Sequence, residues 1–411
     1  MAIDTGDTTW MLISTGLVMM MTPALGFFEA GLLRLKNSLS VIMQTLTGLA
    51  LLSTLWFIIG FTLVFAPDVS GVIGDLSWIF YNNVPFSDSV KWAPTIPGVT
   101  FATYQMMFAV ITPLLITGAF AERMRWSAFF IFVIVWSLVI YYPLAHWVWG
   151  GGWLAQLGVF DFAGGIVIHT SAGMAAIASA IVLGRRKNYG PQIMVPHNIP
   201  LAAIGGSILW LGWFGFNAGS ALASGALAAN ALLVTQIGAS TCALVWVFLS
   251  WKRNGKPTIT AIINGAISGL AGVTPAAGFI SGQHGFILGI VLGFASYYGI
   301  VLLKERLKID DALDVGSVHG ITGIVGALSI GIFASQTINP AGPVGWLYSG
   351  SPMQLIIQGV GVGVAAIMGF VGTIIIMKII DYVVGLKVNE DEEDLGLDVS
   401  QHAETGYSDN R

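Results

Sequence analysis

The chain contains about eleven apolar segments, each close to the ~20 residues with which an α-helix crosses a bilayer. The composition points the same way, because 55% of the residues are hydrophobic and 9% are charged, whereas a soluble domain carries about 25% charged residues. We therefore expect an all-α integral membrane protein. The segments lie at residues 10–33, 40–65, 99–121, 126–144, 163–184, 198–222, 227–250, 258–279, 284–303, 313–333 and 354–384.

Lysine and arginine fall in clusters that follow every second apolar segment. The clusters are Arg34 and Lys36; Arg123 and Arg125; Arg185, Arg186 and Lys187; Lys252, Arg253 and Lys256; Lys304, Arg306 and Lys308; and Lys378 and Lys387. The loops on the opposite side hold only Lys91. Because basic loops stay in the cytoplasm, we expect the N-terminus outside and the C-terminus inside. The sequence thus predicts a multi-pass protein of the plasma membrane, embedded in the lipid bilayer.

Two histidines, His169 and His319, occupy matching positions in two of these segments. In each case an aspartate precedes the histidine by eight residues and a glycine follows it by four, and the two frames are offset by 150 residues (319 − 169). The frames consist of Asp161, His169 and Gly173, and of Asp311, His319 and Gly323. A charged side chain in the hydrocarbon region costs roughly 2.5–3.5 kcal/mol on insertion scales, so an ionisable residue there indicates function. Two imidazoles placed alike suggest one shared central site.

Other features repeat in the same order. Segment 10–33 contains Phe28-Glu29-Ala30-Gly31, and segment 198–222 contains Phe216-Asn217-Ala218-Gly219. Residues 10–184 and 198–333 are therefore interpreted as two copies of one five-helix unit, with segment 354–384 outside the repeat. Five is odd, so the second copy must enter the membrane from the opposite side. Such inverted repeats place substrate sites near the membrane midplane, between the two halves.

The motifs around the histidines resemble the ammonium transporter family (Amt/Mep, with the related Rh proteins). Three segments carry the resemblance most specifically: Ala145–Trp153, read as AHWVWGGGW; Asp161–Gly173, read as DFAGGIVIHTSAG; and Asp310–Gly320, read as DDALDVGSVHG. Gly31–Asn37 and Gly396–Thr405 also look like that family. The resemblance covers essentially the whole chain and fits the Amt branch of prokaryotic type.

The resemblance implies a protomer of eleven helices in a homotrimer, with a narrow apolar pore in each protomer. Trp149, Phe108 and Ser220 match the family's outer ammonium-recruitment site. Phe108 and Phe216 match the two rings that gate the pore, and Asp161 matches a structural acid near the vestibule. His169 and His319, which lie within these motifs, match the family's twin histidines of the pore.

The chemistry of ammonium agrees with these residue types. Aromatic faces attract cations by roughly 0.5–2 kcal/mol each, and a serine hydroxyl accepts a hydrogen bond from an N–H. Passing the bare ion through an apolar pore is very costly unless it is paired, whereas neutral ammonia loses little. The hypothesis is that ammonium binds outside, loses its proton, and crosses as ammonia. The proton either stays outside or travels separately through the histidine pair and water.

Simpler interpretations of the same residues exist. Trp149 fits an interfacial aromatic belt, and Phe108 and Phe216 fit ordinary core packing. Ser220 lies in a run of small residues that suits helix packing. Asp161 fits either direct deprotonation or the organisation of backbone N–H groups, of which we expect the second.

Glu29 departs from the aromatic or small residue expected at its position, and the sequence leaves its effect on conduction open. The two histidines could themselves be satisfied core residues bonded to serine or backbone, and their symmetric placement argues against this.

The segment after the last apolar run is acidic. Eight acids lie between residues 388 and 411, namely Glu390, Asp391, Glu392, Glu393, Asp394, Asp398, Glu404 and Asp409. Their simplest interpretation is a solvated tail. The resemblance implies instead that residues 385–411 pack on the cytoplasmic face of the transmembrane domain (1–384), couple the protomers and respond to a PII-type signal protein.

Transport of ammonium or ammonia is the leading function, and an ammonium sensor that signals through a PII-type partner is the alternative. An Rh-type gas channel would differ only in substrate. A membrane-embedded enzyme would need His169, His319 and Asp161 as metal ligands, yet the chain lacks the H-E-x-x-H pattern of zinc hydrolases. The single cysteine, Cys242, excludes an intramolecular disulfide and a cysteine metal cluster. We expect no enzyme activity, cofactor, metal or nucleic-acid partner.

Overall fold

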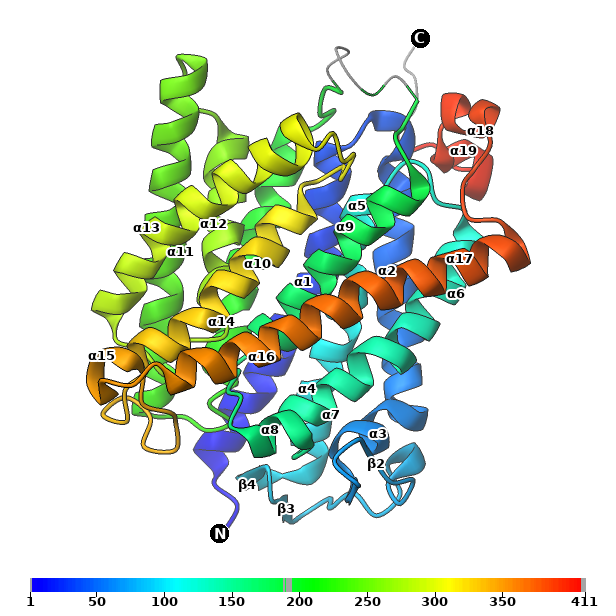
Figure 1. Ribbon diagram of the computed structural model, residues 1–411. Coiled ribbons are helices and arrows are strands. Elements are labelled where there is room, and N and C mark those ends of the chain that lie inside the picture. The colour runs from blue at the N-terminus through cyan, green and yellow to red at the C-terminus, as the bar shows by residue number, and fades with distance from the viewer. Residues whose placement is uncertain (1, 188, 190–193, 408–411) are drawn as a thin grey trace.

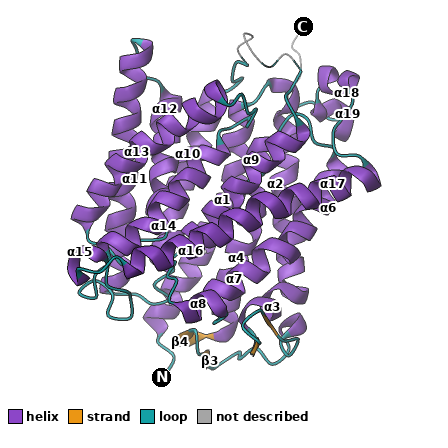
Figure 2. Ribbon diagram, viewed as in Figure 1, coloured by secondary structure: helices purple, strands orange, loops and turns teal. Residues whose placement is uncertain are grey.

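The computed structural model describes residues 2–187, 189 and 194–407, and helices form most of it (Figures 1 and 2). Within this part of the chain, ten helices are long and apolar enough to cross a membrane. They span Thr5–Leu32, Leu35–Phe65, Gly98–Phe120, Trp126–Leu157, Gly165–Leu183, Ile199–Gly219, Ala226–Asn254, Gly282–Arg306, Gly316–Phe333 and Met353–Val384. The predicted class, an all-α multi-pass membrane protein, is confirmed.

The predicted crossing at 258–279 is helical only in part. Helix α12 (Ile259–Val273) has 15 residues, and turns follow it up to Phe279. At 1.5 Å per residue α12 is about 22 Å long, shorter than the ~30 Å hydrocarbon core. Its length therefore does not confirm the predicted count of eleven crossings. This turn makes a tertiary contact, since the Pro275 carbonyl accepts the N–H of Phe162 at 3.0 Å.

Most of the long spans are built from several shorter elements. In chain order the α-helices are α1 (Thr5–Leu32), α2 (Ser38–Leu55), α3 (Phe61–Phe65), α4 (Gly98–Leu114), α5 (Thr117–Phe120), α6 (Trp126–Trp136), α7 (Tyr142–Val148), α8 (Trp153–Leu157), α9 (Ser171–Leu183), α10 (Ile199–Gly219), α11 (Ala226–Asn254), α12, α13 (Gly282–Ile300), α14 (Thr322–Phe333), α15 (Trp346–Ser349), α16 (Met353–Ile367), α17 (Thr373–Val384), α18 (Glu390–Leu395) and α19 (Leu397–His402). Two π-helical turns matter for the site, Gly165–Thr170 before α9 and Gly316–Ile321 before α14.

The first helices of the two predicted repeats, α1 and α10, pack along each other through glycines. A methyl group on Gly205 would overlap the backbone of Phe28, and one on Gly31 would overlap the backbone of Ala202. Small residues allow such close backbone approach, which is how membrane helices gain van der Waals contact without a hydrophobic driving force. The two helices run antiparallel, since Gly205 of α10 lies against Phe28 of α1 while Gly215, next to Phe216, lies against Ser14 and Leu17.

The fifth and tenth segments meet at equivalent glycines. A methyl group on Gly173 would overlap the Gly320 backbone, and one on Gly323 would lie 2.9 Å from the His169 Cβ. Each histidine therefore lies within one helical turn of the point where α9 and the turn before α14 cross. The two glycines are separated by the same 150 residues as the two histidines (323 − 173). The last span, α16–α17, runs obliquely across the outside of the bundle (Figure 1).

The two ends of the described chain lie on opposite sides of the bundle (Figure 1). The N-terminal side carries the short strands of the 66–98 connection: β1 (Asp68–Val69) pairs with β2 (Ile73–Gly74), and β3 (Ser89–Val90) pairs with β4 (Ala93–Pro97). The His146 imidazole bonds this connection to α7, because its ring nitrogens lie 2.7 Å from the Val64 carbonyl and 2.8 Å from an Asp68 carboxylate oxygen.

A buried ion cluster lies on the cytoplasmic side. Arg186 pairs with Asp310 at 2.7 Å and with Glu122 at 2.8 Å, and Arg123 lies 3.2 Å from Asp310. Burial alone would raise the pKa of Asp310, but its hydrogen bonds and ion pairs with the two arginines lower it overall. Asp314 pairs with the preceding basic cluster, at 2.7 Å from Lys304, but within the described residues Asp310 has no ion pair with residues 304–308. Its partners come instead from the loops that follow α5 and α9.

The part of the acidic tail that forms α18 and α19 is folded against the cytoplasmic face rather than extended into solvent. The Asp398 carboxylate is buried and accepts the N–H groups of Leu39 and Ser40 at 3.0 and 2.8 Å. The ammonium group of Lys36 donates to the Glu393 and Asp394 carbonyls at 2.8 and 2.6 Å. The first turn of α2 is thus capped by an acid from α19, a favourable place for negative charge.

Candidate functional site

An outer cavity of about 290 Å³ brings together the residues predicted for ammonium recruitment. Trp149, Phe108 and Ser220 all line it, and Asp161 also contributes to its wall. The three come from the end of α7, the middle of α4 and the end of α10, so only the tertiary fold makes them neighbours. The cavity has room for several water molecules, so a hydrated cation can approach the aromatic wall.

Hydrogen bonds orient the polar atoms of this cavity. The Trp149 indole N–H donates to the Asp161 carbonyl at 2.8 Å, which fixes the plane of the ring. The Ser220 hydroxyl donates to the Phe216 carbonyl at 2.8 Å, so its lone pairs stay available to accept from a ligand N–H. Tyr104 supports this arrangement, because its hydroxyl lies 2.9 Å from the Phe216 carbonyl and 3.3 Å from Ser220 Oγ. The sequence analysis did not identify Tyr104, which lies one turn before Phe108.

Two phenylalanine rings lie between the outer cavity and the histidines. The centroids of Phe108 and Phe216 are 4.3 Å apart, with an interplanar angle of 35°. Both residues are 1% exposed. The Phe216 ring also stacks on His169, with centroids 6.0 Å apart. A solute moving from the outer cavity to the histidines must displace or pass these rings.

His169 and His319 form a direct pair. Their Nδ1 atoms are 3.2 Å apart, and the rings stack with centroids separated by 5.2 Å at an angle of 21°. One Nδ1 must carry the hydrogen and the other must accept it, so in the neutral pair only the accepting imidazole carries its own hydrogen on Nε2. A proton that enters at one Nε2 can therefore leave at the other after the shared hydrogen shifts. Trp213, which the sequence analysis missed, stacks on His169 at 5.5 Å.

The histidine pair does not resemble two separately satisfied core residues. His169 Nε2 is buried and has no hydrogen-bond partner among the described residues. The described part of the chain also brings no third acidic, cysteine or histidine ligand to the pair that would make a metal site. Each histidine lies in a π-helical turn, Gly165–Thr170 or Gly316–Ile321, and such turns are frequent at functional sites.

Asp161 holds the turn that carries His169. Its carboxylate accepts four backbone N–H groups at 2.7–3.0 Å, from Gly164, Gly165, Ile166 and Val167. These are donors at the start of a helical segment, which otherwise lack intrahelical partners. Four bonds occupy the lone-pair positions of a carboxylate. The geometry therefore favours the organisation of backbone N–H groups over direct proton abstraction.

The equivalent aspartate of the second frame is bonded differently. Asp311 Oδ2 accepts the Gly316 N–H at 2.6 Å, while its Oδ1 is buried without a partner among the described residues. Burial and then the neighbouring Asp314 raise the pKa of Asp311 to about 6. Asp314 itself pairs with Lys304 at 2.7 Å. The two frames thus share their spacing while their carboxyl groups have different environments.

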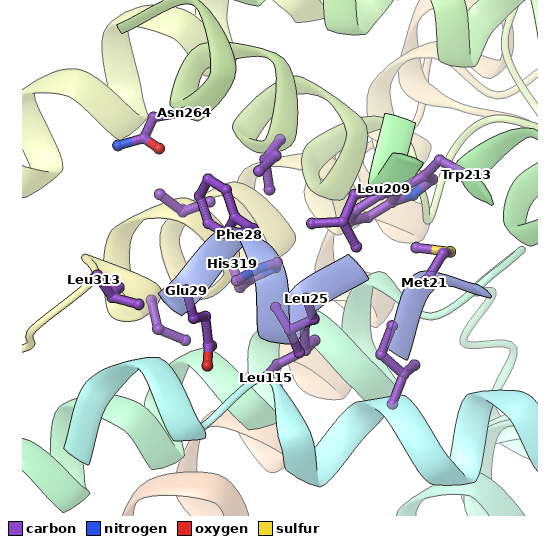
Figure 3. A pocket seen from close by; sticks show the side chains of 14 residues that line it. Met21, Leu25, Phe28, Glu29, Leu115, Leu209, Trp213, Asn264, Leu313 and His319 are labelled. Atoms are coloured by element: carbon purple, nitrogen blue, oxygen red, sulfur yellow. The ribbon is translucent and has the colours of Figure 1, made fainter. Parts of the chain in front are cut away.

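A second, narrower cavity is lined by His319 and by Phe28 and Glu29, near the cytoplasmic end of α1, which places it on the inner side of the pair (Figure 3). His319 lines it together with Leu25, Phe28, Leu115 and Leu209, all of them apolar. Its polar lining side chains are His319, Asn264 and Glu29, apart from the Trp213 indole. The outer and inner cavities share no lining residue, which places the phenylalanine and histidine pairs between them.

Comparison with known proteins identifies the family. The model of the Ammonium Transporter Family matches residues 9–407. Ammonium transporter 1 of Dictyostelium discoideum is 52% identical over 99% of this chain and 88% of its own length. Ammonium transporter Amt1 of Archaeoglobus fulgidus is 41% identical, over 98% of this chain and 99% of its own.

Solved structures agree with these relatives. Candida albicans Mep2 superposes with a TM-score of 0.89 and 35% identity, covering 95% of this chain and 88% of its own. A structure described as a sensor Amt protein has a TM-score of 0.88 and 28% identity, covering 97% of this chain and 98% of its own. With a family match over nearly the whole chain and the histidine pair set between two cavities, this protein belongs to the ammonium transporter family.

Proposed function

We propose that this protein transports ammonium or ammonia across the membrane. Ammonium is recruited in the outer cavity, gives up its proton there, and crosses as ammonia past the phenylalanine rings and the histidine pair. The observation that carries the proposal is the buried Nδ1–Nδ1 contact of 3.2 Å between His169 and His319, set between an aromatic outer cavity and an apolar inner one.

The outer cavity suits a small cation. Trp149 and Phe108 present edge-to-face rings whose centroids are 6.3 Å apart at 85°. Each aromatic face contributes roughly 0.5–2 kcal/mol to cation binding. The Ser220 oxygen accepts one of the four N–H donors, and a potassium ion, with no N–H groups, gains nothing from the directed geometry of that hydrogen bond. Selectivity for ammonium therefore rests on a directed hydrogen bond added to the aromatic attraction.

Deprotonation follows from the change of surroundings beyond Phe108 and Phe216. The rings are apolar, and a bare cation between them would lose its hydration without a compensating partner. Ammonia avoids this cost. The proton either stays in the outer cavity, which makes transport electroneutral, or passes along the histidine pair, which makes it electrogenic.

Assembly and regulation belong to the same proposal. The protein functions as a homotrimer in the lipid bilayer, with one pore in each protomer, and its tail responds to a PII-type signal protein. Support comes from the Gly396–Thr405 segment and from its docking through Asp398 onto α2. Light scattering of the purified protein tests the trimer. A pull-down with a PII-type protein, repeated with Asp398→Ala, tests the tail.

Current measured on a solid-supported membrane tests the transport function. An ammonium pulse over proteoliposomes should give a saturable signal, either as a current or as internal alkalinisation reported by a trapped pH dye. The double variant His169→Ala/His319→Ala should lose the current or lose selectivity over potassium. An unchanged selective current in the double variant would refute the role of the histidines.

A sensor is the second candidate, and the likeness to the sensor Amt structure favours keeping it. A sensor would bind ammonium in the outer cavity without net flux. Ammonium binding by calorimetry, with neither current nor alkalinisation in the wild type, would replace transport by this function.

A further inference from the structure

Glu29 is a buried carboxyl group on the inner side of the histidine pair. It lies in the last turns of α1, is 2% exposed, and lines the same cavity as His319 (Figure 3). Phe28, the residue before it, is also part of the cavity wall. A carboxyl group at this depth is costly when charged, so its presence beside the histidines needs an explanation.

Glu29 has polar neighbours but no ion-pair partner. Within the described residues, the ion pairs of this protein do not include it. Its polar and titratable neighbours are Thr117 and the backbone N–H of Gly118 on α5, Asn264 of α12, His319, and Asp311, whose charge acts on it. Glu122 and Asp310 each have an arginine beside them, and Asp161 accepts four backbone N–H groups, but Glu29 has neither arrangement.

The hydrogen bond with Thr117 serves both protonation states of the carboxyl. Thr117 Oγ1 lies 2.8 Å from Glu29 Oε2 and also contacts the Leu114 carbonyl. A hydroxyl has one hydrogen and two lone pairs. When Glu29 is charged, the hydroxyl donates to it. When Glu29 is protonated, the hydroxyl turns to the Leu114 carbonyl and accepts from the carboxylic acid.

Water can connect this carboxyl to the histidine pair. The inner cavity offers about 30 Å³ to the centres of water molecules, and one water needs about 10–15 Å³ by that measure. Roughly two waters therefore fit between the walls that carry His319 and Glu29. Ammonia that has passed the pair enters the same space.

We propose that Glu29 is the inner proton-exchange site of the pore, where the proton relayed by His319 rejoins ammonia. This rests on the proposed transport function. The His319 imidazolium gives its proton through water to the Glu29 carboxylate. The resulting carboxylic acid gives that proton to ammonia, which forms ammonium and restores the carboxylate. Ammonium then leaves toward the cytoplasm, so each turnover moves one positive charge.

The test compares current and internal pH in proteoliposomes for the wild type, Glu29→Gln and Glu29→Asp. Glu29→Gln keeps the shape but cannot exchange a proton, so its current should fall by about 100-fold, the lower range for a positioned proton donor. Ammonia should still cross, and because it then takes its proton from the vesicle interior, the dye should report alkalinisation. Glu29→Asp should recover part of the current. Asp7→Asn makes the same carboxyl-to-amide change at the outer end of α1 and should keep the wild-type current.

Each outcome decides a different point. A wild-type current in Glu29→Gln, or a wild type that alkalinises the vesicles without current, overturns the role of Glu29 and leaves transport standing. A wild type with neither signal overturns the transport function and this inference with it. If Glu29→Gln does not yield folded trimer by size-exclusion chromatography, Thr117→Val replaces it. That variant should shift the pH dependence of the current without changing ammonia passage, and an unshifted profile refutes the exchange site.

Discussion

The Asp161 carboxylate offers the sharpest test of how the site is built, through Asp161→Asn. An amide has nearly the same shape, but it presents one oxygen and one NH2 group where the carboxylate presents two oxygens. Two of the four N–H groups, those bonded at present to one carboxylate oxygen, would then face an N–H donor. These two N–H groups, at the start of the turn that carries His169, would lose their acceptor.

The magnitude follows from the number of bonds lost. Hydrogen bonds to charged groups contribute about 1.5–3 kcal/mol each. Two lost bonds therefore predict that the free energy of unfolding falls by roughly 3–6 kcal/mol. The effect should be local as well, because the turn from Gly165 to Thr170 positions the His169 imidazole.

Thermal and denaturant unfolding of the purified protein in detergent, monitored by circular dichroism, would measure this loss. Asp88→Asn is the matched control, since Asp88 is exposed in the outer 66–98 connection and should leave the midpoint unchanged. Transport should fall together with stability. An Asp161→Asn variant with the wild-type unfolding midpoint and no transport would refute the reasoning, and would assign Asp161 to proton abstraction instead.

Three further predictions concern other parts of the molecule. Trp149→Leu should weaken the apparent ammonium affinity by about 2- to 30-fold, because a cation–π contact contributes roughly 0.5–2 kcal/mol. The affinity is measured from the concentration dependence of the current, and an unchanged value would make Trp149 an interfacial residue. Arg186→Ala leaves the Asp310 carboxylate buried without its arginine partner at 2.7 Å, and should lower the free energy of unfolding by about 3–5 kcal/mol. Arg253→Ala is the control, because the ion pair of Arg253 is exposed. A smaller loss of stability for Arg186→Ala than for Arg253→Ala would contradict a stabilising role of the buried ion cluster. Because the pKa of Asp310 is lowered in the folded protein, its contribution to the free energy of unfolding is present at neutral pH and lost as the pH falls below about 4. In Asp310→Asn, the free energy of unfolding should therefore fall less between neutral pH and acid than in the wild type.

Much of the architecture was accessible from the sequence, because hydropathy and charge are local properties. Apolar length predicted the membrane class, and the basic clusters predicted which side each loop occupies. Helix ends were less certain. Segment 126–144 continues as helix to Val148, and α8 follows after a break at residues 149–152, whereas segment 40–65 begins at Leu35. Tertiary hydrogen bonds act at such ends, because the Glu122 carboxylate accepts the Arg34 N–H at 3.0 Å, directly before Leu35.

The candidate site could be predicted in its residues but not in all of its contacts. The matched spacing around His169 and His319 indicated a shared position, and motif resemblance indicated Trp149, Phe108 and Ser220. Tyr104 and Trp213 carried no comparable signal, since the chain contains 10 Tyr and 14 Trp and either residue fits ordinary core packing. Their roles emerge from a hydroxyl beside Ser220 and an indole stacked on an imidazole.

The sequence by itself determined the membrane fold, its sidedness and the pairing of two histidines in equivalent frames, because each follows from periodicity, charge or spacing along the chain. Only the tertiary structure decided that the two imidazoles meet through Nδ1, that Asp161 is saturated with N–H donors while Asp311 is not, and that Glu29 shares a cavity with His319. These depend on how helices cross at contacts such as Gly173 against Gly320. Residues about 150 positions apart are brought into contact there by packing, which no local pattern encodes.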